Sequence, residues 1–362
     1  MKIGIDASNI RSGGGKKHLI NFINTSIEEN KNISFFLISN KIIISHFRNT
    51  KRVTCITNSL LNSFNFFAFF SQLLYSSRFF KKNNCELVFV PGGIFLGNFR
   101  PFYTMSQNMI PFESLQLKTF STLKRIKFIL IKYLQINTFK KSKGVIFLTE
   151  YARDKIETYY KVKHKSVIIP HGIKQRKVNS YNLNKNIFNI LYVSDFLPYK
   201  HNYNVAKAVS ELISEGYKIN LNLVGRNDKI QNDKILEIIN SNDNYKTNIN
   251  ILGELDSIEV ENYYSNSSLF LFASTCENLP FIIIEAMSFG LPIISSNKRP
   301  MIDILEGEDI FFDSYNIESI KKIILNNMSN QKLIKLSKHN FSSSKKYLWK
   351  KNSLNTLNFF KH

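Results

Sequence analysis

Short apolar runs alternate with longer helical patterns along most of the chain, and this alternation limits the folds open to it. In the first half, runs typical of strands occupy residues 3–6, 34–38, 53–56, 87–90, 103–106, 145–148 and 167–169. Helical patterns at 18–29, 64–82, 121–139 and 150–160 separate several of them. Because strands that alternate with helices form a parallel sheet covered on both faces, this half predicts a doubly wound α/β domain.

The second half repeats the alternation, with strands at 188–194, 219–224 and 249–252 and helices at 202–215 and 257–265. Polar residues replace the apolar periodicity between the halves. We therefore expect a first domain at 1–173, a hinge at 174–186 and a second doubly wound domain at 187–345. The last helix, 346–362, carries Trp349 and is expected to pack back on the first domain.

Composition favours a reduced, cytosolic protein of two domains. The 362 residues are 43% hydrophobic, which suffices for two cores of ordinary size. Three cysteines without a CxxC pair indicate neither a disulfide framework nor a metal cluster. The start MKIGIDAS lacks the pattern of a secretory signal, so we expect a cytoplasmic location. The apolar window 60–80 is interrupted by polar residues and favours a buried or interfacial helix over a membrane span.

The formal net charge of +22 suggests an anionic partner, which could be a membrane, a nucleic acid or a substrate. A general bias of the chain toward lysine explains the same charge without any binding face. Residues 118–143 concentrate cations among apolar side chains, as an amphipathic helix on an anionic membrane would. A charge-rich face that meets only water is the alternative.

Two carboxylates lie in the stretch ENLPFIIIEAMSFGLPIISS, Glu277 in a loop and Glu285 in a helix that Pro280 can begin and Gly290 can end. Burying an unpaired carboxylate costs several kcal/mol or more, so Glu285 should face water or bind hydroxyl or amide donors, such as those of a sugar. The plainer alternative places Glu285 on the solvent edge of an ordinary helix and Glu277 on the surface.

Other candidates follow predicted strands, where a doubly wound sheet presents its binding edge. After the first strand, Gly14 and Gly15 belong to a glycine run that can approach a phosphate, although a plain turn fits as well. The run is not a dinucleotide fingerprint, since His18 occupies the place of its third glycine. The other candidates in such places are Gln107, Asn108, His171 and Lys200.

Together these pieces resemble the retaining glycosyltransferases of family four, which have the GT-B fold of two Rossmann-like domains facing a central cleft. Glu277 and Glu285 have the E-x7-E spacing of the family's donor-binding signature. SGGG, IFLTEYARDKI, VIIPHGI, LYVSDFLPYKHN and LGEL agree in order and spacing, so the resemblance covers roughly residues 1–340.

The resemblance implies transfer of a sugar from a nucleotide-sugar to an acceptor hydroxyl with retention, without a bound metal or other cofactor. It implies that Glu285 binds the ribose hydroxyls, that Glu277 contacts the donor sugar and that Lys200 binds the phosphates. Glu277 and Lys200 would be the catalytic pair. The backbone N–H groups of Asn278 and Leu279 would face the sugar or the diphosphate.

On the side of the first domain, Gly14 and Gly15 match the glycine loop that closes over the phosphates. Acceptor recognition belongs to the same domain, with His18, Gln107, Asn108 and His171 as candidates.

The chain departs from the family around Lys200. Ser194 and Asp195, a few residues before it, replace a Gly-Arg pair, and His201, directly after it, replaces a glycine. We expect Arg226, at the end of the next strand, to supply the missing charge. His201, a residue that branches making surface polysaccharide also carry, points to lipopolysaccharide or capsule assembly. The basic segment 118–143 is expected to place the enzyme on the inner face of the cytoplasmic membrane, where it would reach a lipid-linked saccharide as acceptor. The rival hypotheses are a sugar-nucleotide epimerase of the same architecture and a basic nucleic-acid-binding or scaffold protein.

Overall fold

The computed structural model describes residues 1–62, 69–162, 166–176, 187–226, 228–307 and 309–361. The chain forms two compact units. Unit 1 consists of Met1–Gly172 and Tyr347–His362, and unit 2 of Ile173–Lys346. Most of the predicted hinge, residues 177–186, and the beginning of the predicted helix 64–82 lie outside the described residues.

Unit 1 is built on a seven-stranded parallel sheet of strand order β3-β2-β1-β4-β5-β6-β7. The strands are β1 (Lys2–Asp6), β2 (Ser34–Ile38), β3 (Val53–Ile56), β4 (Leu87–Val90), β5 (Phe102–Ser106), β6 (Gly144–Phe147) and β7 (Ser166–Ile168). All seven strands predicted for the first half are confirmed, each within one residue at either end. Central strands such as β4 and β6 are buried along their whole length, which explains their unbroken apolar runs.

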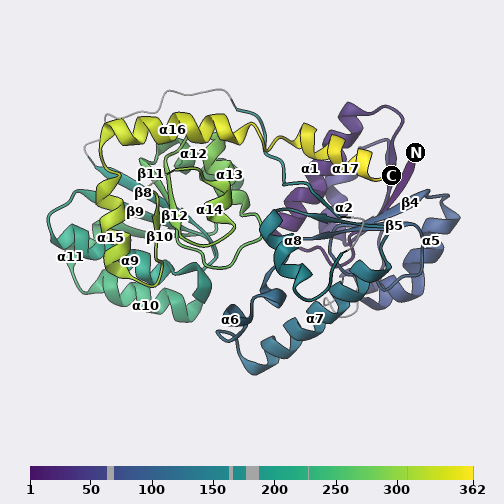
Figure 1. The fold of residues 1–362 in the computed structure, drawn as a ribbon, viewed down its shortest axis with the longest axis horizontal. Coiled ribbons are helices and arrows are strands. Elements are labelled where there is room, and N and C mark those ends of the chain that lie inside the picture. Colours follow the sequence, from purple (N-terminus) through teal and green to yellow (C-terminus); the bar gives the residue numbers. More distant parts are fainter. Residues whose placement is uncertain (63–68, 163–165, 177–186, 227, 308, 362) are drawn as a thin grey trace. The chain divides into compact units, whose positions relative to one another are not determined.

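Helices cover both faces of this sheet (Figure 1). Among the described residues they are α1 (Gly13–Glu29), α2 (Lys41–Ile44), α3 (Ser59–Asn62), α5 (Ser77–Lys82), α6 (Ser114–Leu117), α7 (Thr122–Lys141), α8 (Glu150–Glu157) and α17 (Trp349–Phe359). Within the predicted helix 64–82, residues Gln72–Ser76 form a wider π-helical turn, η2. The buried amide of Gln72 donates to Asp6 Oδ1 at 3.1 Å and to the carbonyl oxygen of Ile94 at 3.0 Å.

Helix α17 packs beside α1, so the segment expected to return to the first domain lies in unit 1 (Figure 1). Ser26 and Ser353 share a hydrogen bond of 2.7 Å across the two helices. Aromatic rings continue the contact, because Phe359 and Phe360 both pack against Tyr103 of β5.

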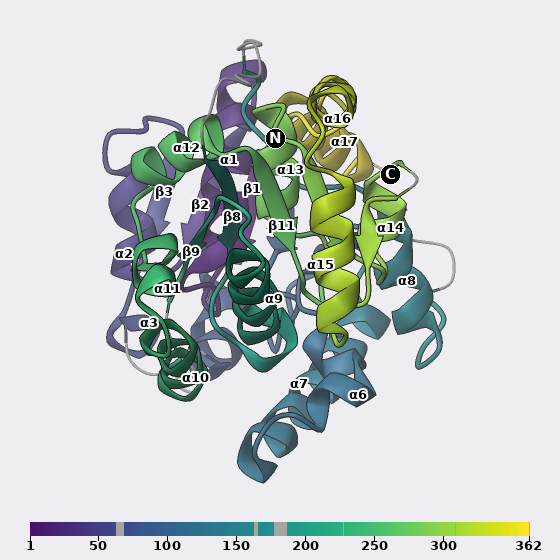
Figure 2. The same cartoon turned by 90° about the vertical axis from the view of Figure 1, so that its left-hand side faces the viewer.

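Unit 2 is a second parallel sheet of six strands, in the order β10-β9-β8-β11-β12-β13. They are β8 (Phe188–Val193), β9 (Ile219–Val224), β10 (Ile249–Gly253), β11 (Leu269–Phe272), β12 (Ile293–Ser296) and β13 (Phe311–Phe312). Its helices are α9 (Asn202–Ser214), α10 (Lys229–Asn240), α11 (Asp243–Asn248), α12 (Ser257–Asn266), α13 (Phe281–Ser288), α14 (Met301–Ile304), α15 (Ile317–Asn326) and α16 (Asn330–Ser344). Figure 2 shows α9 and α15 side by side.

The order of the strands reverses between β8 and β11, since β9 follows β8 on one side and β12 follows β11 on the other. In a doubly wound sheet the crevice at such a switch point, beyond the carboxyl ends of the strands, is where ligands bind. The loops that follow β8 and β11 are therefore the first place to look for a site in unit 2.

None of the helices in the described ranges is long and apolar enough to cross a membrane.

Candidate functional site at the switch point of unit 2

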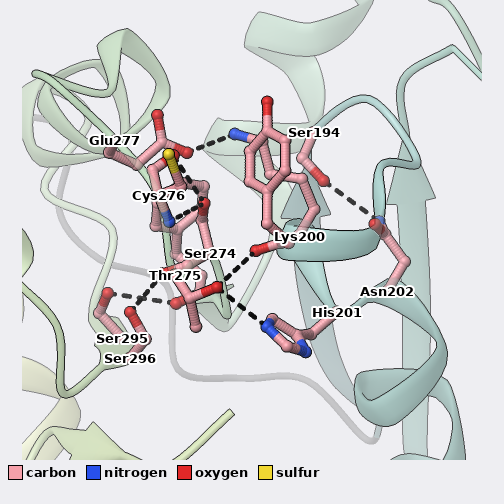
Figure 3. A network of polar contacts seen from close by, with 12 residues as sticks. Ser194, Lys200, His201, Asn202, Ser274, Thr275, Cys276, Glu277, Ser295 and Ser296 are labelled. Atoms are coloured by element: carbon pink, nitrogen blue, oxygen red, sulfur yellow. Dashed lines mark hydrogen bonds and ion pairs between the residues drawn. The ribbon is translucent and has the colours of Figure 1, made fainter. Parts of the chain in front are cut away.

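Two loops meet at the switch point, residues 194–201 after β8 and residues 273–280 after β11 (Figure 3). They begin side by side because β8 and β11 are paired strands. The backbone N–H of Thr275 donates to the carbonyl oxygen of Tyr199 at 2.9 Å and ties one loop to the other. From β12, the hydroxyls of Ser295 and Ser296 donate to the carbonyl oxygens of Phe272 and Ser274 and fix the start of the second loop.

Lys200 and Glu277 form an ion pair across these loops, between Lys200 Nζ and Glu277 Oε1 (Figure 3). The sequence predicted both residues as the catalytic pair, and the structure brings their side chains together. Only 12% of the Lys200 side chain and 14% of the Glu277 side chain are exposed. Because the pair is mostly shielded from water, each charge depends on the other for compensation.

Three aromatic side chains hold Lys200 in place. The hydroxyl of Tyr192, which is fully buried in β8, donates to the carbonyl oxygen of Lys200. The Lys200 ammonium lies 5.3 Å from the ring centroid of Phe272 and 5.4 Å from that of Tyr199. Burial, and then the Glu277 charge, raise the pKa of Tyr199, so this hydroxyl stays neutral beside the pair. The lysine is thus positioned by Tyr192 and Phe272 of two neighbouring strands and by Tyr199 of its own loop.

His201 has a left-handed backbone, with φ of 54°, directly before α9. Such a conformation favours glycine, which explains why the resembled family has a glycine here. The side chain adds two contacts in return: His201 Nε2 lies 3.1 Å from Thr275 Oγ1, and the ring packs edge-on against Tyr315 at 4.6 Å between centroids. Burial lowers the pKa of His201 to about 4, so the ring is neutral at pH 7.

Arg226 lies at the end of β9 and is held by Asp195, the residue found in place of the family's arginine. Its Nη2 is 2.6 Å from Asp195 Oδ2 and its Nε is 3.4 Å from Oδ1. The carboxylate of Asp195 raises the pKa of Arg226 further. Both side chains are exposed to solvent. The sequence predicted that Arg226 supplies the charge missing at Asp195, and the structure adds that these two side chains form an ion pair.

The remaining donor-side candidates lie on the chain that follows β11. Asn278 and Leu279 are buried and come directly before α13, while Glu285 is half-buried in the second turn of that helix. The predicted limits of the helix are confirmed, because Pro280 precedes its first residue and Gly290, with φ of 65°, follows its end. Glu277 and Glu285 thus lie in one continuous strand–loop–helix segment, Glu277 in its loop and Glu285 in its helix.

The glycine loop lies in unit 1, where Gly14 and Gly15 form the first turn of α1. Gln107, after β5, is beside this turn: a Cβ atom added to Gly15 would come 3.3 Å from Gln107 Oε1. The side chain of Gln107 also donates to the carbonyl oxygen of Pro91 at 2.9 Å. Asn108 has a different role, because its Oδ1 accepts from the N–H of Ile110 and closes a local turn. Of these two candidates, only Gln107 is placed at the glycine turn.

The other two acceptor-side candidates, His18 and His171, form a buried pair in unit 1. Their Nδ1 atoms are 3.1 Å apart, so one ring donates and the other accepts. His18 stacks on Phe22, and its ring centroid lies 5.8 Å from that of Trp349. Burial lowers the pKa of His18 to about 3 and holds that of His171 well below its usual value, with the neighbouring His18 as a second cause.

Because His18 and His171 are buried with lowered pKa values, we expect the protein to lose stability in acid. The unfolded chain binds protons as the pH falls below about 6.5, whereas folded His18 does not until about pH 3. The free energy of unfolding should therefore fall by a few kcal/mol between pH 7 and pH 4. Urea titrations followed by the fluorescence of Trp349, the only tryptophan of the sequence, measure it. In the His18→Gln/His171→Gln variant this pH dependence should be much weaker, and an unchanged slope would contradict the assignment.

Sequence reasoning missed Asp6, a fully buried carboxylate at the carboxyl end of β1. Its Oδ1 accepts from Ser8 Oγ at 2.6 Å, from Ser8 N at 3.2 Å and from Gln72 Nε2. Burial raises the pKa of Asp6. The carboxylate fixes the chain between β1 and the glycine loop. An acid directly after an apolar strand was the available signal.

Part of the chain is similar in sequence to a known family and to a curated protein. Residues 173–344 match the family model of glycosyl transferases group 1. Protein CapJ of Staphylococcus aureus is 27% identical over 186 residues, which are 50% of this chain and 45% of CapJ. The chain thus spans under half the length of that curated relative.

Two solved structures resemble the whole chain. HepE of Anabaena in complex with UDP and glucose is 14% identical, with a TM-score of 0.71 over 100% of this chain and 99% of that chain. The apo form of the lipopolysaccharide outer core galactosyltransferase WaaB is 13% identical, with a TM-score of 0.67 over 100% of both chains. These likenesses confirm the predicted fold, GT-B with two parallel α/β units.

Proposed function

We propose that this protein, whose residues 173–344 belong to the glycosyl transferases group 1, moves a sugar from a nucleotide-sugar to an acceptor hydroxyl with retention at the anomeric carbon. The observation that carries the proposal is the Lys200–Glu277 pair at the switch point of unit 2. A cation and an acid at this edge suit the two ends of a nucleotide-sugar, because phosphate needs positive charge and sugar hydroxyls need acceptors.

The chemistry assigns each residue a task. The bond between the anomeric carbon and the diphosphate oxygen breaks, and the diphosphate leaves with the electron pair. The acceptor oxygen bonds to the anomeric carbon on the same face of the sugar, and its proton passes to the leaving diphosphate. Lys200 stabilises the negative charge that grows there, which lowers the barrier because this charge is larger in the transition state than in the bound donor. Glu277 accepts hydrogen bonds from the sugar, and Glu285 accepts them from the ribose. Lys200 provides the positive charge, so the proposal includes no metal and no other cofactor.

For the acceptor we propose a lipid-linked saccharide of a surface polysaccharide, reached from the cytoplasmic side of the membrane. WaaB, which shares the fold, is named as a lipopolysaccharide outer core galactosyltransferase. Among the four acceptor-side candidates, Gln107 is the one that we assign to acceptor recognition, and its position beside the glycine turn supports this assignment.

A screen of donors tests the proposal. Thermal shift with nucleoside diphosphates and their sugars should select one nucleotide, and the selected sugar should then appear on an acceptor. A sugar-nucleotide epimerase, the nearest rival, would convert the donor without any acceptor. Binding of no nucleotide at all would reject both enzymes.

The Asp195–Arg226 pair leads to a prediction about donor affinity. Asp195 neutralises part of the charge that Arg226 could offer to a diphosphate. Asp195→Asn should therefore tighten the binding of the nucleoside diphosphate by about threefold, since exposed charges contribute under about 1 kcal/mol. Arg226→Ala should weaken it by a similar factor. Isothermal titration at two salt concentrations measures both, and the hypothesis fails if Arg226→Ala leaves affinity and turnover unchanged.

A further inference from the structure

The first half of α7 exposes an apolar face. Residues 121–127 are exposed, and the buried residues of the helix, Gln135, Thr138 and Phe139, all lie in its second half. Leu123, Ile126, Leu130 and Tyr133 follow one another at spacings of three and four residues, which places them on one side of the helix. With Ile129 next to them they form what we call the outward stripe, whose members are between 54% and 82% exposed. A contiguous exposed stripe of this kind marks an interaction surface.

Cations border the outward stripe. At 100° per residue, Lys127 falls on one edge and Arg125 on the other, with Lys124 and Lys132 further round. The sequence contains no acidic residue between Glu113 and Glu150. Within the described residues, no carboxylate pairs with Lys124 or Lys127. The Arg125 guanidinium donates to the carbonyl oxygens of Phe120 and Lys118 at 2.7 and 2.8 Å, which fixes the chain that leads into the helix.

We propose that the outward stripe lies in the headgroup region of an anionic bilayer, parallel to the membrane plane. Leu123, Ile126 and Leu130 enter the upper acyl chains, and the bordering cations meet lipid phosphates. The charges decide between possible occupants. A second copy of this chain would bring the same cations against each other, and like charges at an interface are costly. The inference rests on the proposed function in one respect: a lipid-linked acceptor would give the enzyme a reason to lie on the membrane.

Vesicle sedimentation with two lipid compositions tests the apolar part of the proposal. The probes are phosphatidylcholine vesicles and vesicles with about one third phosphatidylglycerol. Leu123→Gln/Ile126→Gln/Leu130→Gln should bind anionic vesicles at least about tenfold more weakly than the wild type. The matched control, Ile42→Gln/Ile230→Gln/Ile258→Gln, changes three equally exposed side chains elsewhere and should bind as the wild type does. All six positions are at the surface, so circular dichroism should show intact folds.

A charge-matched pair of variants tests the electrostatic part. Lys124→Glu/Lys127→Glu should weaken binding to anionic vesicles by about 30-fold or more, since each cation near the surface contributes about 1 kcal/mol. Lys229→Glu/Lys234→Glu on α10 gives the chain the same net charge and should have little effect.

Three results would overturn the proposal: equal loss in both charge variants, full binding by the apolar variant, or a dimer that the apolar variant dissociates without any change in vesicle binding. Vesicle binding needs no catalysis. A failed donor screen with intact binding would therefore reject the proposed function alone.

Discussion

Glu277→Gln should lower kcat/KM for sugar transfer at least about a hundredfold, because it removes the charge that Lys200 depends on and an acceptor for the donor sugar. The substitution keeps the shape of the side chain. Lys200, only 12% exposed, loses its compensating charge, so the free energy of unfolding should also fall by about 1–3 kcal/mol. Initial rates with the selected nucleotide-sugar and urea unfolding measure the two effects separately.

The double variant Lys200→Met/Glu277→Gln separates catalysis from stability. With both charges removed, no unpaired charge remains, and most of the lost stability should return. Transfer should not return, because the phosphate has lost its cation. A purely structural pair would instead regain both. Asp243→Asn is the control for a general effect of charge, since it breaks the exposed Lys246–Asp243 pair of 2.8 Å and should change neither quantity.

Gly225→Ala should be the most destabilising single change near the site, by about 4 kcal/mol or more. Gly225 has φ of 142°, and a Cβ atom there would lie 2.0 Å from the carbonyl oxygen of Ser194. The three atoms nearest to this Cβ are all backbone atoms of Ser194 and Asp195, so no flexible side chain can move aside. The loop after β8 must shift to make room. If Gly225→Ala still folds, it should therefore bind the donor poorly. Urea unfolding followed by far-UV circular dichroism is the measurement, because Trp349 lies in unit 1.

Gly216→Ala is the matched control for this prediction. Gly216 also has a positive φ, of 92°, but no atom lies within 4 Å of the added Cβ. It should cost only about 1–2 kcal/mol, the strain of the backbone alone. Similar losses in the two variants would show that conformation, and not the contact with Ser194, governs the effect at Gly225.

The fold was predictable because several of its strands are apolar along their whole length. In a parallel sheet both faces are covered, so strands such as β11 and β4 appear in the sequence as unbroken apolar runs. Helices α10 and α11 were not predicted, because polar residues dominate them and few of their side chains are buried. The π-helical turn at Gln72 was also missed, since it depends on a partner, Asp6, that is 66 residues away in sequence.

The sequence allowed us to predict which residues form the site, but not which of their side chains contact one another. Lys200 and Glu277 could be named from their places after strands, whereas their direct contact depends on the pairing of β8 with β11. Asp195 looked like a loss, and only the tertiary structure reveals Arg226 as its partner. His18 and His171 are 153 residues apart, and their contact depends on the packing of α1 on the sheet, where Phe22 meets Phe35 and Phe89. Contacts between distant residues were therefore the part that the sequence could not provide.

The packing of α17 has a consequence for synthesis on the ribosome. Unit 1 is interrupted after Gly172 and resumes at Tyr347, so unit 2 emerges complete before the last helix of unit 1 exists. Until then, the rings of Phe89 and Tyr103 lack Phe360, and the crowded contact of Gly172 with Trp349 cannot form. A nascent chain in this state exposes apolar surface that favours aggregation. Chaperone demand should thus be greatest while residues 173–346 are being translated, and a chain truncated at 346 should be insoluble.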